Sequence, residues 1–279
     1  ASDVYKRQPL EWAMIYNNLG EAWRKMPTGD RTENLHRAIE AYEAALTVYT
    51  EDGRPLKWAA TQNDLGDSWS EVQTGDRTEN LQRAIDAYEA ALRVFTKVAQ
   101  PFNWAGTQRK LGEAWCAMLT GNCPENLTRA IDAYEAALSV YEKDAYPVNW
   151  AVTQGCLGVA WLQMPTGDQV SNLQRAIAAF ESALTVNTKD GHPFEWAKAQ
   201  LNMGEAWRRM PAGDRTENLK QAIGAYERAS SVFTKDFHPI YWAITQSNLG
   251  VAWLQMPTGD QVSNLQRAIT ASEAALTIC

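Results

Sequence analysis

Hydrophobic residues along the chain recur at the spacing of one face of an α-helix. After the turn at Gly75, apolar residues lie three, four, seven, ten, eleven and fourteen positions from the first of them, which is the helical period. These residues are Leu81, Ala84, Ile85, Tyr88, Ala91, Leu92 and Phe95. No segment shows sustained alternation of apolar and polar residues between hairpin turns, the pattern of a strand. The sequence therefore predicts an all-α chain.

The segment before this turn predicts a second kind of helix, which carries two tryptophans. Positions i, i+4, i+7, i+8 and i+11 fall on one stripe of a helix. In residues 55–69 these positions are Trp58, Gln62, Leu65, Gly66 and Trp69. Because one helix pair cannot bury such a stripe alone, we expect the two rings to be buried between stacked neighbours.

Tryptophan pairs of this kind recur every 46 residues. The twelve tryptophans are Trp12, Trp23, Trp58, Trp69, Trp104, Trp115, Trp150, Trp161, Trp196, Trp207, Trp242 and Trp253. A fixed period of this length is typical of a solenoid and not of separate globular domains. Residues 9–279 are therefore predicted to form one solenoid of six repeats, each with a first and a second helix. The repeats are 9–54, 55–100, 101–146, 147–192, 193–238 and 239–279.

Prolines, glycines and aspartates mark the predicted helix ends. Pro55 and its counterparts suit the first turn of each first helix, where a missing N–H costs nothing. Gly75 and its counterparts follow the first helix and supply the turn. Asp76, with Glu79 three residues later, has the form of a capping box at the start of the second helix.

Small and polar residues on the helix faces predict close packing. Gly66 and its counterparts lie on the tryptophan stripe, where glycine costs ~1 kcal/mol of helix propensity. We therefore expect a backbone or a bulky ring to pass close to each of them. Asn80 and Gln62 also have counterparts along the chain. Because buried polar groups persist only when hydrogen-bonded, we expect these residues to form a repeated side-chain hydrogen bond between neighbouring elements.

Composition and charge exclude several classes of protein. The net charge is −7 and the pI is about 5.1, whereas nucleic-acid binding and anionic-membrane binding require a basic surface. Four cysteines do not make a disulfide scaffold. No apolar run approaches the roughly 20 residues of a transmembrane helix, and the start of the chain lacks the apolar core of a secretory signal. We expect a cytoplasmic protein that binds neither nucleic acid nor membrane.

Side chains suited to catalysis or metal binding do not form a recognisable constellation. His36, His192 and His238 lack metal-ligand spacing, and Cys116 and Cys123 lack partnering histidines. We interpret the four cysteines as incidental thiols. No phosphate-binding glycine loop is present. The sequence thus predicts a protein that is not an enzyme and that has no metal or cofactor.

The recurring residues resemble the signature of the tetratricopeptide repeat family. In the first repeat the matching residues are Leu19, Gly20, Trp23, Ala38, Tyr42 and Ala45, and corresponding sets recur in all six. The repeat is longer than the standard unit of about 34 residues. The resemblance implies a right-handed superhelical solenoid of helix-turn-helix units that binds a protein or peptide.

The resemblance also implies a concave binding face lined by the first helices. The candidate partner-binding residues on this face are Asn17, Glu21, Arg24, Asn63, Arg109, Val159, Leu162, Lys198, Glu205, Arg208, Arg209, Val251 and Leu254. These positions differ between repeats while the signature positions hardly change, as a common scaffold with a varied binding surface would show. A solvated face that drifts without constraint is the alternative. Alternating apolar and charged patches would suit an extended or helical peptide.

The ends of the chain support a second hypothesis. Residues 157–177 and 249–269 are identical and lie two repeat lengths apart, which indicates duplication of a two-repeat unit. Residues 1–8 do not fit the repeat, and we interpret them as a tag, a scar or a truncation edge. No polar capping helix follows the last repeat, although solenoids need caps for solubility. We expect a fragment of a longer protein or an array whose ends stack on another copy, which would make the chain a structural or regulatory arm of a larger signalling protein.

Overall fold

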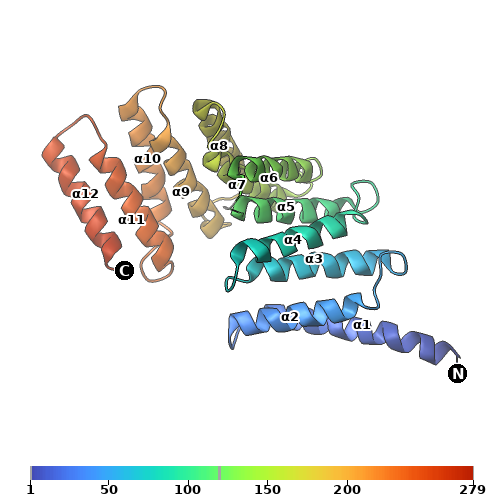
Figure 1. Cartoon of the computed structure of the whole chain (residues 1–279). Coiled ribbons are helices and arrows are strands. Elements are labelled where there is room, and N and C mark those ends of the chain that lie inside the picture. Colours follow the sequence, from blue (N-terminus) through green and yellow to red (C-terminus); the bar gives the residue numbers. More distant parts are fainter. Residues whose placement is uncertain (1, 119–120, 279) are drawn as a thin grey trace. The chain divides into compact units, whose positions relative to one another are not determined.

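The computed structural model describes residues 2–118 and 121–278, with side chains from residue 8 onwards. Over these residues the chain forms twelve α-helices and no strand, which confirms the all-α prediction (Figure 1). The first helices are α1 (Ser2–Lys25), α3 (Pro55–Glu71), α5 (Pro101–Ala117), α7 (Pro147–Gln163), α9 (Pro193–Arg209) and α11 (Pro239–Leu254). The second helices are α2 (Arg31–Leu46), α4 (Arg77–Leu92), α6 (Cys123–Leu138), α8 (Gln169–Leu184), α10 (Arg215–Ser230) and α12 (Gln261–Leu276).

The helices pack in chain order within two compact units, residues 1–141 and 142–279. In each unit a first helix packs against the second helix of its own repeat, and that second helix packs against the first helix of the next repeat. Figure 1 shows these pairs stacked one after another within each unit. This sequential packing is that of a helical repeat array, in which each repeat contacts only its neighbours.

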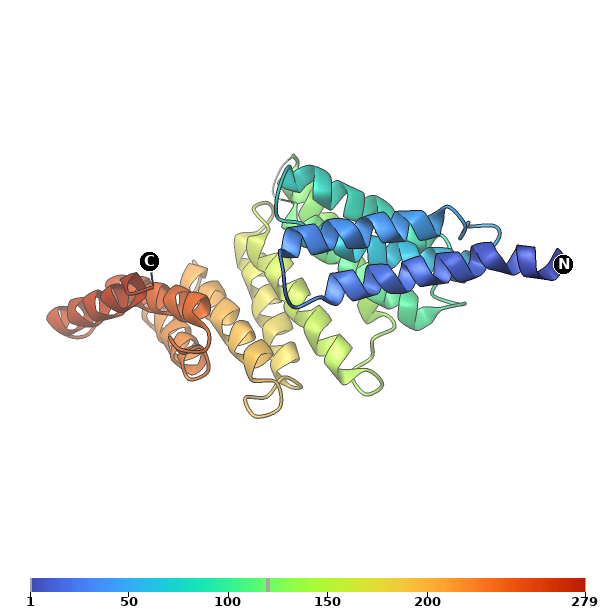
Figure 2. The ribbon, with the colours of Figure 1, turned by 90° about the horizontal axis from the view of Figure 1, so that it is seen from below.

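The predicted helix starts are confirmed in most repeats. Five of the first helices begin at their proline, whereas α1 begins at Ser2, so that Pro9 lies inside a helix that extends beyond α2 (Figure 1, Figure 2). At the second helix of repeat two, the Asp76 carboxylate accepts hydrogen bonds from the backbone N–H groups of Thr78 and Glu79. Aspartates cap α2, α8 and α10 in the same way, and Asp260 caps α12 with one such bond. Repeat three differs, because Asn122 makes no such bond.

The glutamate of the predicted capping box has another role. The Glu79 side chain pairs with Arg83, four residues later, with 2.6 Å between Oε1 and Nη2. The Arg83 guanidinium lies over the Trp69 ring, 4.5 Å from its centroid. The aspartate therefore caps the helix, while the glutamate holds the arginine that covers a tryptophan.

A glycine in the left-handed region forms the turn inside each repeat. The φ angles of the six turn glycines lie between 74° and 87°, values that residues with a Cβ rarely adopt. The Asn34 side chain fastens this turn by donating from Nδ2 to the Thr28 carbonyl at 2.8 Å. Asn80, Asn172, Asn218 and Asn264 make the corresponding bond. The predicted asparagine hydrogen bond is confirmed, and it lies within each repeat.

The predicted glutamine hydrogen bond is present in only part of the chain. Gln200 Oε1 accepts from Arg228 Nε at 2.9 Å, and Gln246 Nε2 donates to Ser230 Oγ at 3.4 Å. Each of these two bonds joins neighbouring helices. Across the described side chains the bond does not recur in every repeat, so that part of the prediction is wrong.

One apolar cluster recurs at three of the interfaces between consecutive repeats within the units. Between repeats one and two, four residues of α2 pack with two residues of the next repeat. The six are Leu35, Ala38, Ile39, Tyr42, Leu65 and Val72. The same positions meet between repeats four and five and between repeats five and six. At these three interfaces the hydrophobic stripe of the second helix thus packs against the repeat that follows it.

The glycines of the tryptophan stripe lie directly under an aromatic ring. A Cβ placed on Gly66 would be only 2.6 Å from Cε1 of Tyr88. Gly20, Gly112, Gly158 and Gly204 have the same relation to Tyr42, Tyr134, Phe180 and Tyr226. In repeat six, Gly250 faces Ser272 instead. The predicted close approach of a bulky ring is confirmed in five repeats.

The tryptophans are less buried than predicted. Trp58 and Trp115 are buried, Trp12 is exposed, and the others are half-buried. Trp58 packs against residues of repeat one, including Tyr49, which fits a role in joining repeats. Ten of the rings also lie beneath a lysine or arginine, at 4.5 to 5.9 Å from the ring centroid. A half-buried ring can contact its neighbour on one side and a solvated cation on the other.

Candidate functional site

The first helices of each unit lie next to one another and form what we call the first-helix layer. In the first unit α3 contacts both α1 and α5, and in the second unit α9 contacts both α7 and α11. All of the predicted binding residues lie on these six helices. The predicted binding face therefore corresponds to the first-helix layer.

The exposure of the predicted residues divides them into three groups. Exposed residues are Glu21, Lys198, Val251 and Leu254. Half-buried residues are Asn17, Arg24, Asn63, Arg109, Val159, Glu205, Arg208 and Arg209. Leu162 alone among them is buried. Only part of the predicted face is therefore free surface.

Leu162 belongs to the core and not to a binding surface. Its side chain is 7% exposed and packs with Met203 and Ala206 of repeat five. Its counterpart in repeat six, Leu254, is 63% exposed, because no helix among the described residues covers it. The assignment of Leu162 to the binding face is corrected by the position of α9, which the family's contact pattern did not reveal.

The two predicted asparagines connect consecutive repeats. Asn17 Oδ1 accepts a hydrogen bond from Thr61 Oγ1 at 2.7 Å, and Asn63 Oδ1 accepts one from Thr107 Oγ1 at 3.2 Å. Each bond runs from one first helix to the next. Part of the polar surface of these asparagines is therefore used inside the layer.

Ion pairs join the three first helices of the first unit. Arg24 of α1 contacts two carboxylates of α3, Glu71 at 3.1 Å and Asp67 at 3.7 Å. Lys110 of α5 lies 2.8 Å from the same Asp67, whose other oxygen accepts a hydrogen bond from Tyr88 at 2.9 Å. Asp67 therefore receives contacts from three helices besides its own, and the network holds the repeats together.

The titration of this network fits a structural role. Burial raises the pKa of the Asp64 carboxyl, and the neighbouring charge of Asp67 raises it further. Burial and Asp67 also hold the pKa of Tyr88 well above its ordinary value. Burial lowers the pKa of Arg24, but the carboxylates of Asp67 and Glu71 outweigh burial and raise it overall. Arg24 and Tyr88 thus keep their protons at neutral pH, which suits fixed contacts.

The charged residues predicted in the second unit are also engaged. Arg208 and Glu205 pair on α9, with 2.6 Å between Nη2 and Oε1, and Tyr226 donates to Glu205 at 3.2 Å. Arg209 Nη1 donates to the backbone carbonyl of Leu162 at 2.9 Å. Lys198, in contrast, is exposed on the layer.

The remaining predicted residues lie on the same layer and are either paired on their own helix or apolar. Glu21 pairs with Lys25, and Arg109 pairs with Glu113, in each case one helical turn apart. Val159 is half-buried beside the cluster between repeats four and five, whereas Val251 is exposed. The structure therefore does not gather the charged candidates into one site.

An internal pairing explains one row of the varied positions. The residue after the signature glycine is acidic in the four repeats whose ring residue is tyrosine, and it is valine where that residue is Phe180 or Ser272. The hydrogen bonds from Tyr88 to Asp67 and from Tyr226 to Glu205 supply the reason. This covariation is visible in the sequence and is the signal that would have identified the pairing. In repeats two and five the acidic residue of this row is therefore engaged by packing, whereas in repeat one Glu21 pairs with Lys25 instead of the Tyr42 hydroxyl.

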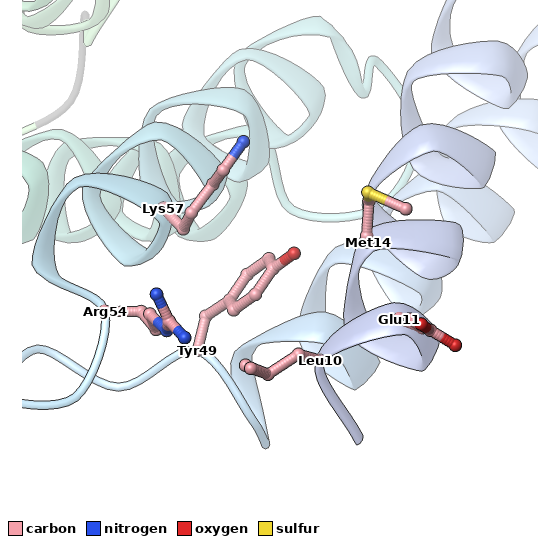
Figure 3. Close-up of a pocket in the computed structure, with 6 residues that line it drawn as sticks. All are labelled: Leu10, Glu11, Met14, Tyr49, Arg54 and Lys57. Carbon is pink, nitrogen blue, oxygen red and sulfur yellow. The ribbon is translucent and has the colours of Figure 1, made fainter. Parts of the chain in front are cut away.

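A small pocket lies between the middle of α1 and the start of α3, within the first unit. It has a volume of about 240 Å³ and is lined by Leu10, Glu11, Met14, Tyr49, Arg54 and Lys57. Figure 3 shows the Tyr49 ring between the two helices, with Arg54 and Lys57 on the α3 side. Ligand pockets usually measure roughly 300–1,000 Å³, so this one has room for a side chain of a partner and not for a cofactor.

The described part of the chain offers little support for metal binding, a reactive cysteine or a membrane-spanning helix. The residues described there contain no group of three or more His, Cys, Asp or Glu side chains placed to hold a metal ion. Burial raises the pKa of the Cys116 thiol to about 11, so it is protonated and poorly nucleophilic at neutral pH. Within the same residues, none of the helices combines the length and apolar character needed to cross a membrane.

No protein-family model matches the chain, and no curated protein matches it either. Its architecture is therefore the finding that classifies it. The paired helices, their 46-residue period and their sequential packing make the chain a helical repeat protein.

Proposed function

We propose that the chain is a tetratricopeptide-like scaffold whose first-helix layer binds a segment of another protein. One observation carries the proposal. The residues six positions before the signature glycine, here called the outer row, differ in every repeat, and most of them are exposed. They are Met14, Ala60, Gly106, Val152, Lys198 and Ile244. The internal contacts that explain other varied rows do not explain this one.

The outer row of the second unit suggests the chemistry of the partner. Val152, Lys198 and Ile244 follow one another on α7, α9 and α11, so an apolar, a cationic and an apolar side chain lie on neighbouring helices. Packed helices are about 8–10 Å apart, and an extended peptide advances about 3.3 Å per residue. A matching peptide would therefore carry an acidic residue with an apolar residue three positions away on each side.

Selection from a random peptide display library tests the proposal. We expect the chain to enrich peptides with this apolar–acidic–apolar spacing. Binding of a selected peptide, measured by fluorescence anisotropy, should weaken at least about tenfold in Lys198→Glu, because an attractive charge becomes a repulsive one. Lys220→Glu is the matched control, since Lys220 is an exposed lysine on the second helix of the same repeat.

Two results would contradict the proposal. One is a selected peptide that binds Lys198→Glu and Ile244→Asp as tightly as the original chain. The other is equal weakening by Lys198→Glu and Lys220→Glu, which would indicate a general charge effect and not a site on the layer.

A further inference from the structure

The pocket in the first unit, here called the Tyr49 pocket, has a counterpart in repeat five. Repeats one and five lie four repeat lengths apart, so each residue that lines the pocket has a matching residue in the second unit. In the order Leu10, Glu11, Met14, Tyr49, Arg54 and Lys57, the matching residues are Phe194, Glu195, Lys198, Phe233, His238 and Tyr241. The two sites can therefore be compared position by position.

In repeat five the protein's own aromatic rings fill this site. The Tyr241 ring is stacked on the Phe233 ring, with 4.8 Å between centroids and 24° between planes. The Phe194 ring meets both of them edge-on, at 5.6 Å from Phe233 and 5.2 Å from Tyr241. The His238 ring lies 5.5 Å from Phe233. Phe233, the counterpart of Tyr49, is thus surrounded by three rings.

Repeat one keeps the central ring and lacks the three around it. Leu10, Arg54 and Lys57 stand where repeat five has the other rings, and a hollow of about 240 Å³ remains beside Tyr49 (Figure 3). Arg54 and Lys57 are exposed, and their long side chains can turn outward when another group enters. The pocket therefore has the shape of a ring site whose ring is not supplied by the chain.

Access to this site does not depend on whether another repeat precedes it. Repeat four precedes repeat five, yet Lys198, the counterpart of Met14, is exposed, and Phe194 and Tyr241 are only half-buried. The apolar residues that pack in the cluster around Phe233 come from repeats five and six. The corresponding surface of repeat one is formed by repeats one and two in the same way.

The charges around the pocket indicate what accompanies the ring. Arg54 and Lys57 lie on its α3 side, and neither forms an ion pair with a side chain that the structure describes. Glu11 lies on the α1 side and would repel a carboxylate there. An acidic residue of a partner would therefore meet the pocket on its α3 side, next to the two cations.

We propose that the Tyr49 pocket binds a phenylalanine or tyrosine side chain of a partner protein, next to which the partner has an acidic residue. The bound ring takes the place that Tyr241 has in repeat five, against Tyr49. The pocket lies in the first unit and the peptide site proposed on Val152, Lys198 and Ile244 lies in the second, so either site can exist without the other.

Selection from a random peptide display library on the Lys198→Glu chain tests the proposal. This variant removes the cation of the second-unit site, so failure of that site and failure of the pocket are measured separately. We expect enriched peptides to carry Phe or Tyr next to Asp or Glu. In fluorescence anisotropy, replacing the aromatic residue of a selected peptide by Ala should weaken binding at least about tenfold, because the buried ring supplies most of the contact.

Filling the pocket from within is the decisive variant. Lys57→Tyr, made in the same chain, supplies the residue that stacks on Phe233 in repeat five. We expect peptide affinity to fall at least about tenfold while the thermal stability is unchanged or higher, which separates a filled pocket from a damaged fold. Asn103→Tyr is the matched control, since Asn103 is exposed and stands at the same position of repeat three. If Lys57→Tyr does not fold, Lys57→Glu replaces it and should weaken binding by repelling the acidic residue.

The methyl resonances of two methionines locate the bound peptide. The Met14 methyl group should shift on binding, because an aromatic ring then lies beside it. The Met203 methyl group, in the core cluster between repeats four and five, should not shift.

Several outcomes would overturn the inference. Selection that enriches no peptide, or peptides without an aromatic residue, overturns it. So does a selected peptide that binds the folded Lys57→Tyr chain as tightly as before, or one that Asn103→Tyr weakens equally. A peptide that shifts Met203 and leaves Met14 unchanged binds elsewhere and also overturns it.

Discussion

Repeats four and six contain the same run of residues in different surroundings. Residues 157–177 and 249–269 are identical, and in both repeats they form the end of a first helix, a glycine turn and most of a second helix. Both turns are followed by an aspartate that caps the next helix. Yet Leu162 and Leu173 are core residues, whereas Leu254 and Leu265 are exposed.

The comparison separates local from neighbour-dependent properties. The helix starts, the capping aspartate and the glycine turn recur in both repeats, and only the end of the first helix differs, by one residue, because these features depend on residues within a few positions of each other. Burial differs, because it depends on whether another repeat lies against the surface. Properties of the first kind should respond equally to a substitution in either repeat, and properties of the second kind should not.

The largest difference is expected for the buried leucines. Leu173→Ala should lower the free energy of unfolding by about 3 kcal/mol, because it leaves a cavity in the cluster between repeats four and five. Leu265→Ala should cost less than about 1 kcal/mol, because its side chain is already partly in water. Urea denaturation measures both. Equal losses would show that the exposed surface of repeat six is covered in solution.

A smaller difference is expected for the glycines of the tryptophan stripe. In Gly158→Ala the new methyl group would meet the fully buried Phe180 ring at 2.6 Å, so we expect a net loss of about 1–2 kcal/mol after a gain of about 1 kcal/mol in helix propensity. In Gly250→Ala the methyl group would meet the Ser272 hydroxyl, which can rotate away, and the Ala268 carbonyl oxygen at 3.1 Å, a smaller conflict than a buried ring, so stability should change by less than about 1 kcal/mol. Thermal unfolding followed by circular dichroism compares the two. A larger loss for Gly250→Ala would contradict the role of the ring.

Restoring the missing ring should make repeat six resemble repeat four. Ser272→Phe places the side chain of Phe180 at the corresponding position of α12. We expect α12 to gain about 1 kcal/mol of stability from the buried part of the ring. Hydrogen exchange of the α12 amides measures the gain, with the α8 amides as the internal reference. Unchanged protection of α12 would mean that the ring needs a following repeat to be buried.

The smallest effect should be equal in the two repeats. Arg175 and Arg267 each lie 4.5 Å from the centroid of the tryptophan ring in their own repeat. Arg175→Gln and Arg267→Gln should each cost about 0.5 kcal/mol, because a solvated cation over a half-buried ring contributes about that much. Repeat five has Gln221 at this position, so the substitution fits the fold. Urea denaturation of the two single variants measures both losses. A loss confined to Arg175→Gln would show that the contact depends on the neighbouring repeat.

The candidate site was predictable only in part. The first helices and the identity of their varied positions follow from the 46-residue period. The sequence did not reveal that Asn17 and Asn63 bond to the next repeat, or that Arg24 pairs with Asp67 and Glu71, because these contacts join residues about one repeat apart. The pairing of Tyr88 with Asp67 could have been predicted from the sequence, because the acidic residue after the signature glycine and the tyrosine of the second helix vary together from repeat to repeat.

The sequence by itself determined the repeat length, the twelve helices, the aspartate caps and the glycine turns. Each depends on spacing or on hydrogen bonds within a few residues, and each therefore recurs wherever the same residues recur. Tertiary structure alone decided which copy of a residue is buried, as Leu162 and Leu254 show. The physical reason is that burial is a property of two surfaces in contact, and a repeat encodes only its own surface.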